Sequence, residues 1–254
     1  MRLQDKVAII TGGSSGIGRE IAKKFAAEGA RVAIANRTIA TGEETAAEIT
    51  GQGGTAWAYA CDVSKAADVE ALVAAVEADQ GPVDILVANA GTLINKPVEE
   101  LTEDDWDTTM AINLKGVFLP VRAVVPGMKG RGSGKLILIG SIAGTWGYAT
   151  GAAYCSSKGG VIMMMKALTA ELAGHGINVN CISPGATATP LNAEHRADPE
   201  ILALFSRNTP SGRDFVPPQD MAGAAVFLAS DDSKAVHGMN LVVDDGFSSV
   251  KPAG

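Results

Sequence analysis

Two side chains suited to proton transfer stand one helical turn apart in this chain, at Tyr154 and Lys158. Four residues are about one turn, so a helix would project the phenol and the ammonium from the same face. A cation beside a phenol favours the phenolate, so it lowers the pKa of the tyrosine and makes it a candidate general acid and base. An ordinary helix surface can carry the same pair. Ser141, thirteen residues upstream, is a candidate third member, although a serine after a strand can also just cap a turn.

A glycine-rich segment, TGGSSGIG at residues 11–18, lies where the first expected strand meets the first expected helix. Glycines there permit a tight turn and let the backbone approach a pyrophosphate, while the helix N-terminus supplies unpaired N–H groups. A flexible turn without a ligand is the alternative, and the position between strand and helix disfavours it. The residues expected at the phosphates are Gly12, Ser14, Ser15, Gly16, Ile17 and Gly18. This segment and the Tyr154/Lys158 pair together predict hydride transfer.

The position that selects between nicotinamide cofactors follows the second expected strand and holds Asn36 and Arg37. An acidic residue there would bind the ribose 2′-hydroxyl and select NAD, whereas Asn36 does not repel a 2′-phosphate and Arg37 can pair with it. We therefore expect NADP, with NAD as the alternative if Arg37 is only a solvated loop residue. Asp62 and Val63 end the third expected strand, where Asp62 would either lie near the adenine amino group or cap the next turn.

Short β-branched runs alternate with longer runs rich in alanine and glutamate along the chain. Strands are expected at 7–11, 31–35, 55–60, 83–88, 135–140, 177–182 and 240–243. Helices are expected at 16–28, 41–50, 65–80, 102–125, 151–174 and 219–230. Strands that are apolar throughout and alternate with helices predict a parallel sheet covered on both faces. The segment 190–218 is expected to be irregular and mobile, and no linker or repeat divides the chain.

Composition narrows the classes of partner. The chain has 254 residues, 46% of them hydrophobic, and a net charge of −7 without a cluster of Lys and Arg. Nucleic acid and anionic membranes are therefore not expected as partners. The three cysteines form no CxxC pair and the three histidines are scattered, so we expect no disulfide framework and no metal site. Nothing resembles a secretory signal or a membrane span, and a reducing cytoplasm fits the cysteine usage.

Taken together, the motifs resemble those of the short-chain dehydrogenase/reductase family over essentially the whole chain. Order and spacing both agree, which is more specific than any single motif. The matching elements are Thr11-Gly12-x-x-x-Gly16-x-Gly18, Asp62-Val63, Asn89-Ala90-Gly91, Asn113, Ser141, Tyr154-x-x-x-Lys158 and Pro184-Gly185. The resemblance implies one doubly wound Rossmann domain over residues 1–254, with a seven-stranded parallel sheet and a substrate lid at about 190–218.

The resemblance also implies a role for each matching residue. Ser141 would bind the substrate oxygen, Tyr154 would exchange the proton, and Lys158 would hold the ribose and lower the pKa of the tyrosine. Asn113 would hold a water that relays protons from the lysine. The cofactor pocket would be lined by Asn89, Ala90, Gly91, Pro184, Gly185, Thr187 and Thr189.

The expected reaction interconverts a secondary alcohol and a ketone. The substrate pocket is expected from Ile142, Ala143, Thr145, Trp146, the 93–96 loop and the lid, and it should be fairly apolar. A nucleotide-binding regulatory protein of the same fold is the alternative, although such a protein would be expected to have lost part of the Ser/Tyr/Lys set.

The resemblance implies a homotetramer or homodimer through helices 102–126 and 151–174. One departure from the family pattern, Asp244-Asp245-Gly246 in place of an acid and two glycines, would alter packing near a subunit interface.

Overall fold

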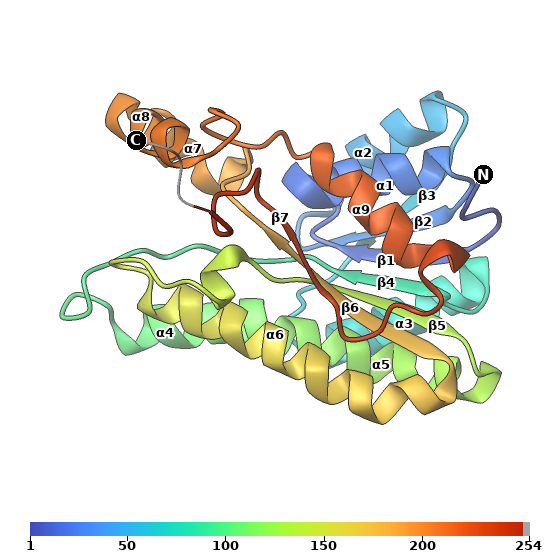
Figure 1. The fold of residues 1–254 in the computed structure, drawn as a ribbon. Coiled ribbons are helices and arrows are strands. Elements are labelled where there is room, and N and C mark those ends of the chain that lie inside the picture. Colours follow the sequence, from blue (N-terminus) through green and yellow to red (C-terminus); the bar gives the residue numbers. More distant parts are fainter. Residues whose placement is uncertain (251–254) are drawn as a thin grey trace.

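A computed structural model describes residues 1–250, whose strands form one parallel sheet (Figure 1). The sheet has seven strands in the order β3-β2-β1-β4-β5-β6-β7, so the chain builds one half outward from β1 and then the other half from β4. The strands are β1 (Val7–Thr11), β2 (Arg31–Asn36), β3 (Thr55–Ala60), β4 (Ile85–Ala88), β5 (Gly134–Ile139), β6 (Ile177–Pro184) and β7 (Asn240–Val243). The predicted doubly wound α/β fold is confirmed.

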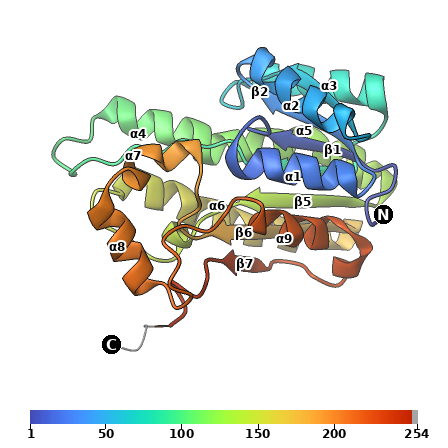
Figure 2. The same cartoon turned by 90° about the horizontal axis from the view of Figure 1, so that it is seen from above.

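Helices cover both faces of the sheet (Figures 1 and 2). They are α1 (Gly16–Ala27), α2 (Ile39–Gly51), α3 (Ala66–Gln80), α4 (Glu103–Met110), α5 (Gly116–Arg131), α6 (Ala152–Leu172), α7 (Ala193–Arg196), α8 (Pro199–Asn208) and α9 (Asp220–Ala229). Helices α3, α5 and α6 lie on one face, and α1, α2 and α9 lie on the other. The strand order reverses between β1 and β4, and ligands of such sheets bind at the carboxyl ends of the strands beside that reversal.

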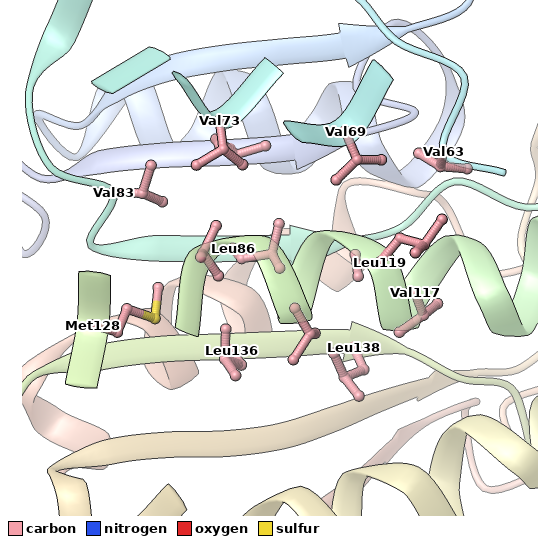
Figure 3. Close-up of a cluster of buried hydrophobic side chains, with 14 of the residues drawn as sticks. Val63, Val69, Val73, Val83, Leu86, Val117, Leu119, Met128, Leu136 and Leu138 are labelled. Atoms are coloured by element: carbon pink, nitrogen blue, oxygen red, sulfur yellow. The ribbon is translucent and has the colours of Figure 1, made fainter. Parts of the chain in front are cut away.

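The core consists of two apolar layers, one on each face of the sheet. Figure 3 shows part of the first layer, where Val69 of α3 and Leu119 of α5 pack toward Leu86 and Leu138 of the central strands. The second layer joins α1, α2 and α9 to the opposite faces of the same strands. Every residue of β1, β4 and β6 is buried. Strands β1 and β4 are accordingly almost entirely apolar, whereas β6 also buries Asn178, Asn180 and Ser183.

One predicted helix forms but contains a π-helical turn. The sequence predicts a single helix over 102–125, whereas α4 ends at Met110, a π-helical turn covers Ala111–Lys115, and α5 continues to Arg131. Thr102 caps the start of α4 in a reciprocal capping box with Asp105. Isolated π-helical turns often mark functional sites, and this one contains Asn113.

The prediction of an irregular 190–218 segment is also wrong in part, because α7 and α8 lie within it. Helix α8 begins conventionally, with the Asp198 carboxylate accepting a hydrogen bond from the Glu200 amide and Pro199 in the first turn. Both helices lie beyond the carboxyl ends of the strands (Figure 2). A parallel bridge between Thr187 and Val216 closes the base of the segment.

The helical stretch Glu103–Arg131 is long and apolar enough to cross a membrane by length and composition alone, at 29 residues and mean hydropathy 1.2. Core helices of globular proteins meet the same criterion. Here Val117, Leu119, Val121 and Val124 are buried against the sheet, which accounts for the apolar composition.

Candidate active site

A cavity of about 1390 Å³ opens at the carboxyl edge of the sheet and reaches from the turn after β1 to helices α7 and α8. Fourteen residues singled out in the sequence lie on its wall: Gly12, Ser15, Gly16, Ile17, Asn89, Ala90, Gly91, Ser141, Tyr154, Lys158, Pro184, Gly185, Thr187 and Thr189. The structure thus brings the glycine-rich turn and the proton-transfer pair to one crevice, although they are more than 130 residues apart in the chain.

The turn after β1 has no room for side chains. Gly12 has a φ of +64°, and a Cβ atom there would lie 3.0 Å from the Ala90 Cα. A Cβ atom on Gly18 would lie 2.4 Å from the Gly12 carbonyl oxygen. The Asn89 amide donates to the carbonyl oxygens of Thr11 and Gly12 at 2.9 and 3.1 Å, which fixes the end of β4 to this turn.

The first turn of α1 suits a phosphate group. Ser15 at its N-cap makes no side-chain capping hydrogen bond, so the backbone N–H groups of the turn are not capped by that side chain. Gly16 faces Thr189 so closely that a Cβ atom would lie 3.1 Å from the threonine Cβ. A bare backbone cradle at a helix N-terminus fits the pyrophosphate of a dinucleotide.

Tyr154 and Lys158 lie in the first two turns of α6, with the Lys158 Nζ 5.8 Å from the centroid of the tyrosine ring. The ammonium is buried and donates to the Ile139 carbonyl oxygen at 2.9 Å, at the end of β5. Ser141 follows β5 directly, and its Oγ accepts a hydrogen bond from the Ala143 amide at 3.1 Å. All three side chains lie on the wall of the same cavity.

Burial dominates the protonation of this pair. Desolvation raises the pKa of Tyr154, while an interaction with the Ser141 hydroxyl opposes the rise. The net direction is opposite to the lowering predicted from Lys158, because desolvation of the phenolate is the larger cause. Desolvation also lowers the pKa of Lys158, to about 8. Each group is therefore shifted toward its neutral form by the same physical cause.

The lowered pKa of Lys158 predicts how stability depends on pH. Between pH 8 and pH 10.5 the unfolded chain holds a proton that the folded chain has released, so the free energy of unfolding rises with pH. Relative to Lys158→Met, the wild type should gain about 3 kcal/mol across this window. Chemical denaturation of both proteins at several pH values measures the difference, and parallel curves would contradict the assignment.

Asn113 is fully buried in the π-helical turn and both of its side-chain polar atoms are used. Its Oδ1 accepts from the Thr92 amide at 2.8 Å, and its Nδ2 donates to the Thr92 carbonyl oxygen and to the Ser157 Oγ. Ser157 in turn donates to the Tyr154 carbonyl oxygen at 2.7 Å. Asn113 does not line the cavity. Its side chain instead connects the loop after β4 to the helix that carries the tyrosine.

The residues expected at the adenosine end lie outside this cavity. The Asn36 amide turns toward the start of α2 and donates to the Thr38 carbonyl oxygen and the Thr41 hydroxyl. Arg37 is exposed and makes no hydrogen bond or ion pair within residues 1–250. Asp62 caps the following turn by accepting from Ser64, which lowers the pKa of its carboxyl group.

Val63 and Ser14 also lie off the cavity wall. Val63 is buried and packs so closely on α5 that a Cβ atom on Gly116 would lie 2.7 Å from its methyl group. Its side chain therefore packs in the core in this structure. The Ser14 carbonyl oxygen accepts from the Thr45 hydroxyl at 3.4 Å, which connects the glycine-rich turn to α2.

The far end of the cavity is an aromatic wall. Trp146 and Phe247 meet edge to face at 5.2 Å, and Phe205 packs on both Phe215 and Phe247. Trp146 was expected in the substrate pocket, and Phe205 and Phe215 lie in the expected lid, whereas Phe247 was missed and Thr145 lies off the wall. The carboxyl-end rule for parallel strands was the available signal for Phe247, because it follows β7 by four residues.

The Asp244-Asp245-Gly246 departure lies directly before this wall. The buried Asp244 carboxylate accepts from the Gly246 and Ser248 amides at 3.0 and 2.8 Å. Asp245 has a φ of +55°, a region that favours glycine, and forms two hydrogen bonds to Arg213. The extra carboxylate therefore ties the C-terminal turn to the end of the 190–218 segment. Within residues 1–250 no group of three or more His, Cys, Asp or Glu side chains could hold a metal ion.

Comparison with known proteins agrees with this geometry. A family model described as short chain dehydrogenase matches residues 6–200. D-threitol dehydrogenase of Mycolicibacterium smegmatis is 43% identical over 247 residues, covering 97% of this chain and 94% of the relative. Galactitol 2-dehydrogenase of Agrobacterium fabrum is 40% identical over 256 residues, covering 97% and 98%. The structure of a gluconate 5-dehydrogenase from Burkholderia cenocepacia in complex with NADP and tartrate superposes with a TM-score of 0.95 at 36% identity, covering 98% and 97%.

Proposed function

Since this chain belongs to the short-chain dehydrogenase family and is an enzyme acting on CH–OH groups, we propose that it interconverts a secondary alcohol and a ketone with a nicotinamide cofactor. The observation that carries the proposal is the convergence of Ser141, Tyr154 and Lys158 on one wall of the cavity that also contains the glycine-rich turn. A regulatory nucleotide-binding protein, the alternative, would not require these three side chains to lie together.

The bound nicotinamide supplies the hydride in reduction and takes it up in oxidation. In the direction of reduction, negative charge develops on the carbonyl oxygen of the substrate. Ser141 and Tyr154 donate hydrogen bonds to that oxygen, and donors fixed in advance are worth a few kcal/mol each. Tyr154 then delivers its proton, and the buried Lys158 ammonium stabilises the resulting phenolate. Ser157 and Asn113 hold the backbone at Tyr154 in place.

The direct test has two stages. Fluorescence titration with NADPH, NADH and S-adenosylmethionine shows which cofactor binds, and a panel of alcohols and ketones followed by nicotinamide absorbance shows turnover. We expect a reduced nicotinamide to bind and at least one pair to react. Binding of S-adenosylmethionine alone would place the chain in another reaction class, and nicotinamide binding without any turnover would favour the regulatory alternative.

We propose NADP as the preferred cofactor, supported by the neutral Asn36 and the exposed Arg37 at the end of β2. Arg37→Ala should weaken NADPH binding by about 10-fold or more and leave NADH binding within about twofold, because only NADPH carries the 2′-phosphate. Titration of both cofactors against both proteins measures the change. Lys65→Ala is the matched control, since it removes a cation that lies beside Asp62 at the same edge. Equal loss for both cofactors would contradict the assignment.

We also propose a homodimer or homotetramer formed through α4, α5 and α6. An apolar groove lined by Met110, Leu114, Phe118 and Met164 runs between these helices. Phe118 is 43% exposed, so Phe118→Glu should shift the molar mass from light scattering toward the monomer. Val98→Glu, on an exposed loop, is the control and should leave the mass unchanged. A wild-type protein that is already monomeric would refute the interface.

A further inference from the structure

We propose that the substrate is an uncharged alcohol or ketone and that the cavity discriminates against carboxylates, sulfonates and phosphates. The inference rests on the hydride transfer proposed above and adds the charge class of the substrate.

The wall of the cavity has almost no charge to offer an anion. Among the residues that line it within 1–250, Lys158 is the single Asp, Glu, Lys or Arg, and His195 is the single histidine. Its ammonium is already committed to the Ile139 carbonyl oxygen and lies beside the Tyr154 ring. An anionic group bound deeper in the cavity would therefore be desolvated without a salt-bridge partner, which is costly.

Two arginines lie two residues from the aromatic wall in sequence, the exposed Arg207 and Arg213, and neither lines the cavity. Arg213 lies two residues before Phe215, and its guanidinium binds Asp245 at 2.6 and 2.8 Å and Asp220 at 3.1 Å. Two carboxylates thus neutralise the side chain. Arg196 donates to the Thr189 carbonyl oxygen and does not line the cavity.

What the wall does offer suits neutral hydroxyl groups and a carbon skeleton. The Tyr148 hydroxyl donates to the Asn95 Oδ1 at 3.0 Å, and the Asn95 amide nitrogen makes no hydrogen bond within residues 1–250. The Asn208 amide donates to the Leu204 carbonyl oxygen, while its own oxygen is likewise unused within that range. One neutral donor and one neutral acceptor therefore lie on the wall of the cavity that also contains Trp146.

Matched substrate pairs in which a carboxylate replaces one terminal CH2OH group test the inference. Threitol against threonate and galactitol against galactonate are compared with the wild-type enzyme and the cofactor that it binds. We expect kcat/KM for the neutral member to exceed that for the acid by at least about 100-fold. Equal or faster turnover of the acid would overturn the inference and leave the proposed hydride transfer intact. No turnover of any alcohol by a cofactor-loaded enzyme would instead contradict the proposed function.

A pair of variants tests whether wall charge is the cause. Asn208 is exposed near the end of α8, so Asn208→Arg and Asn208→Asp are compatible with the fold. The ratio of acid to neutral kcat/KM should be at least about 10-fold higher in the arginine variant than in the aspartate variant. If the ratio of acid to neutral kcat/KM were the same in both variants, charge on the wall would not control selectivity.

Discussion

Tyr154→Phe is expected to lower kcat by at least about 10³-fold while the affinity for NADPH stays within about twofold. The substitution keeps the ring on α6 and removes the hydroxyl, so it removes both the proton and one hydrogen bond to the developing oxyanion. General acid catalysis contributes about 10²–10⁴-fold, and loss of one preorganised donor costs about 10²–10³-fold. Steady-state kinetics and a cofactor titration on the same preparation measure the two effects separately.

Tyr148→Phe is the matched control for that experiment. Tyr148 lies on the wall of the same cavity, but its hydroxyl is committed to Asn95 and burial raises its pKa. We expect at most about a 10-fold change in kcat/KM, because the lost group is a wall hydrogen bond rather than the proton donor. Comparable losses in the two variants, or more than a tenth of wild-type activity in Tyr154→Phe, would show that Tyr154 is not the acid.

Gly18→Ala is expected to be the most damaging methyl addition in the glycine-rich turn. The new Cβ atom would lie 2.4 Å from both the Gly12 carbonyl oxygen and the Asn89 amide nitrogen. The backbone oxygen cannot move without displacing the turn, so the amide must leave its bonds to Thr11 and Gly12. We expect a loss of about 2 kcal/mol in the free energy of unfolding and at least about a 10-fold loss of cofactor affinity.

The control is Gly223→Ala, because Gly223 lies inside α9 and a Cβ atom there has open space around it. Removing a helical glycine should stabilise that variant by about 0.5–1 kcal/mol. Denaturant unfolding and cofactor titration of both variants measure the contrast. If Gly18→Ala bound the cofactor with wild-type affinity, the turn after β1 would tolerate a side chain, and the tight packing of Gly18 against Gly12 and Asn89 would have no role in binding.

The sequence was most informative where a local pattern had one structural solution. An apolar run such as Val7–Thr11 is buried on both faces in a parallel sheet, and the structure has β1 at that range. The four-residue spacing of Tyr154 and Lys158 placed both side chains on one side of α6, as helical geometry requires. Thr102 and Asp105 are three residues apart and form the capping box that this spacing permits.

The misses occurred where distant contacts outweighed local preference. The helix predicted over 102–125 contains a π-helical turn at Asn113, whose amide binds Thr92 and Ser157 across the structure. The segment after Pro190 contains α8 rather than loop alone, and its Phe205 packs on aromatic residues that follow in the chain. The direction of the Tyr154 pKa shift was missed because desolvation depends on what surrounds the ring in three dimensions.

The amino-acid sequence by itself determined the order of strands and helices, the glycine-rich turn and the candidate proton-transfer pair, because each depends on neighbours within a few positions. Only the tertiary structure decided that Ser141, Tyr154 and Lys158 share a cavity with that turn, and that Phe247 forms part of the wall of this cavity. It also decided that Arg213 is paired with Asp245. The physical reason is that burial, packing and charge pairing are properties of contacts between segments far apart in the chain.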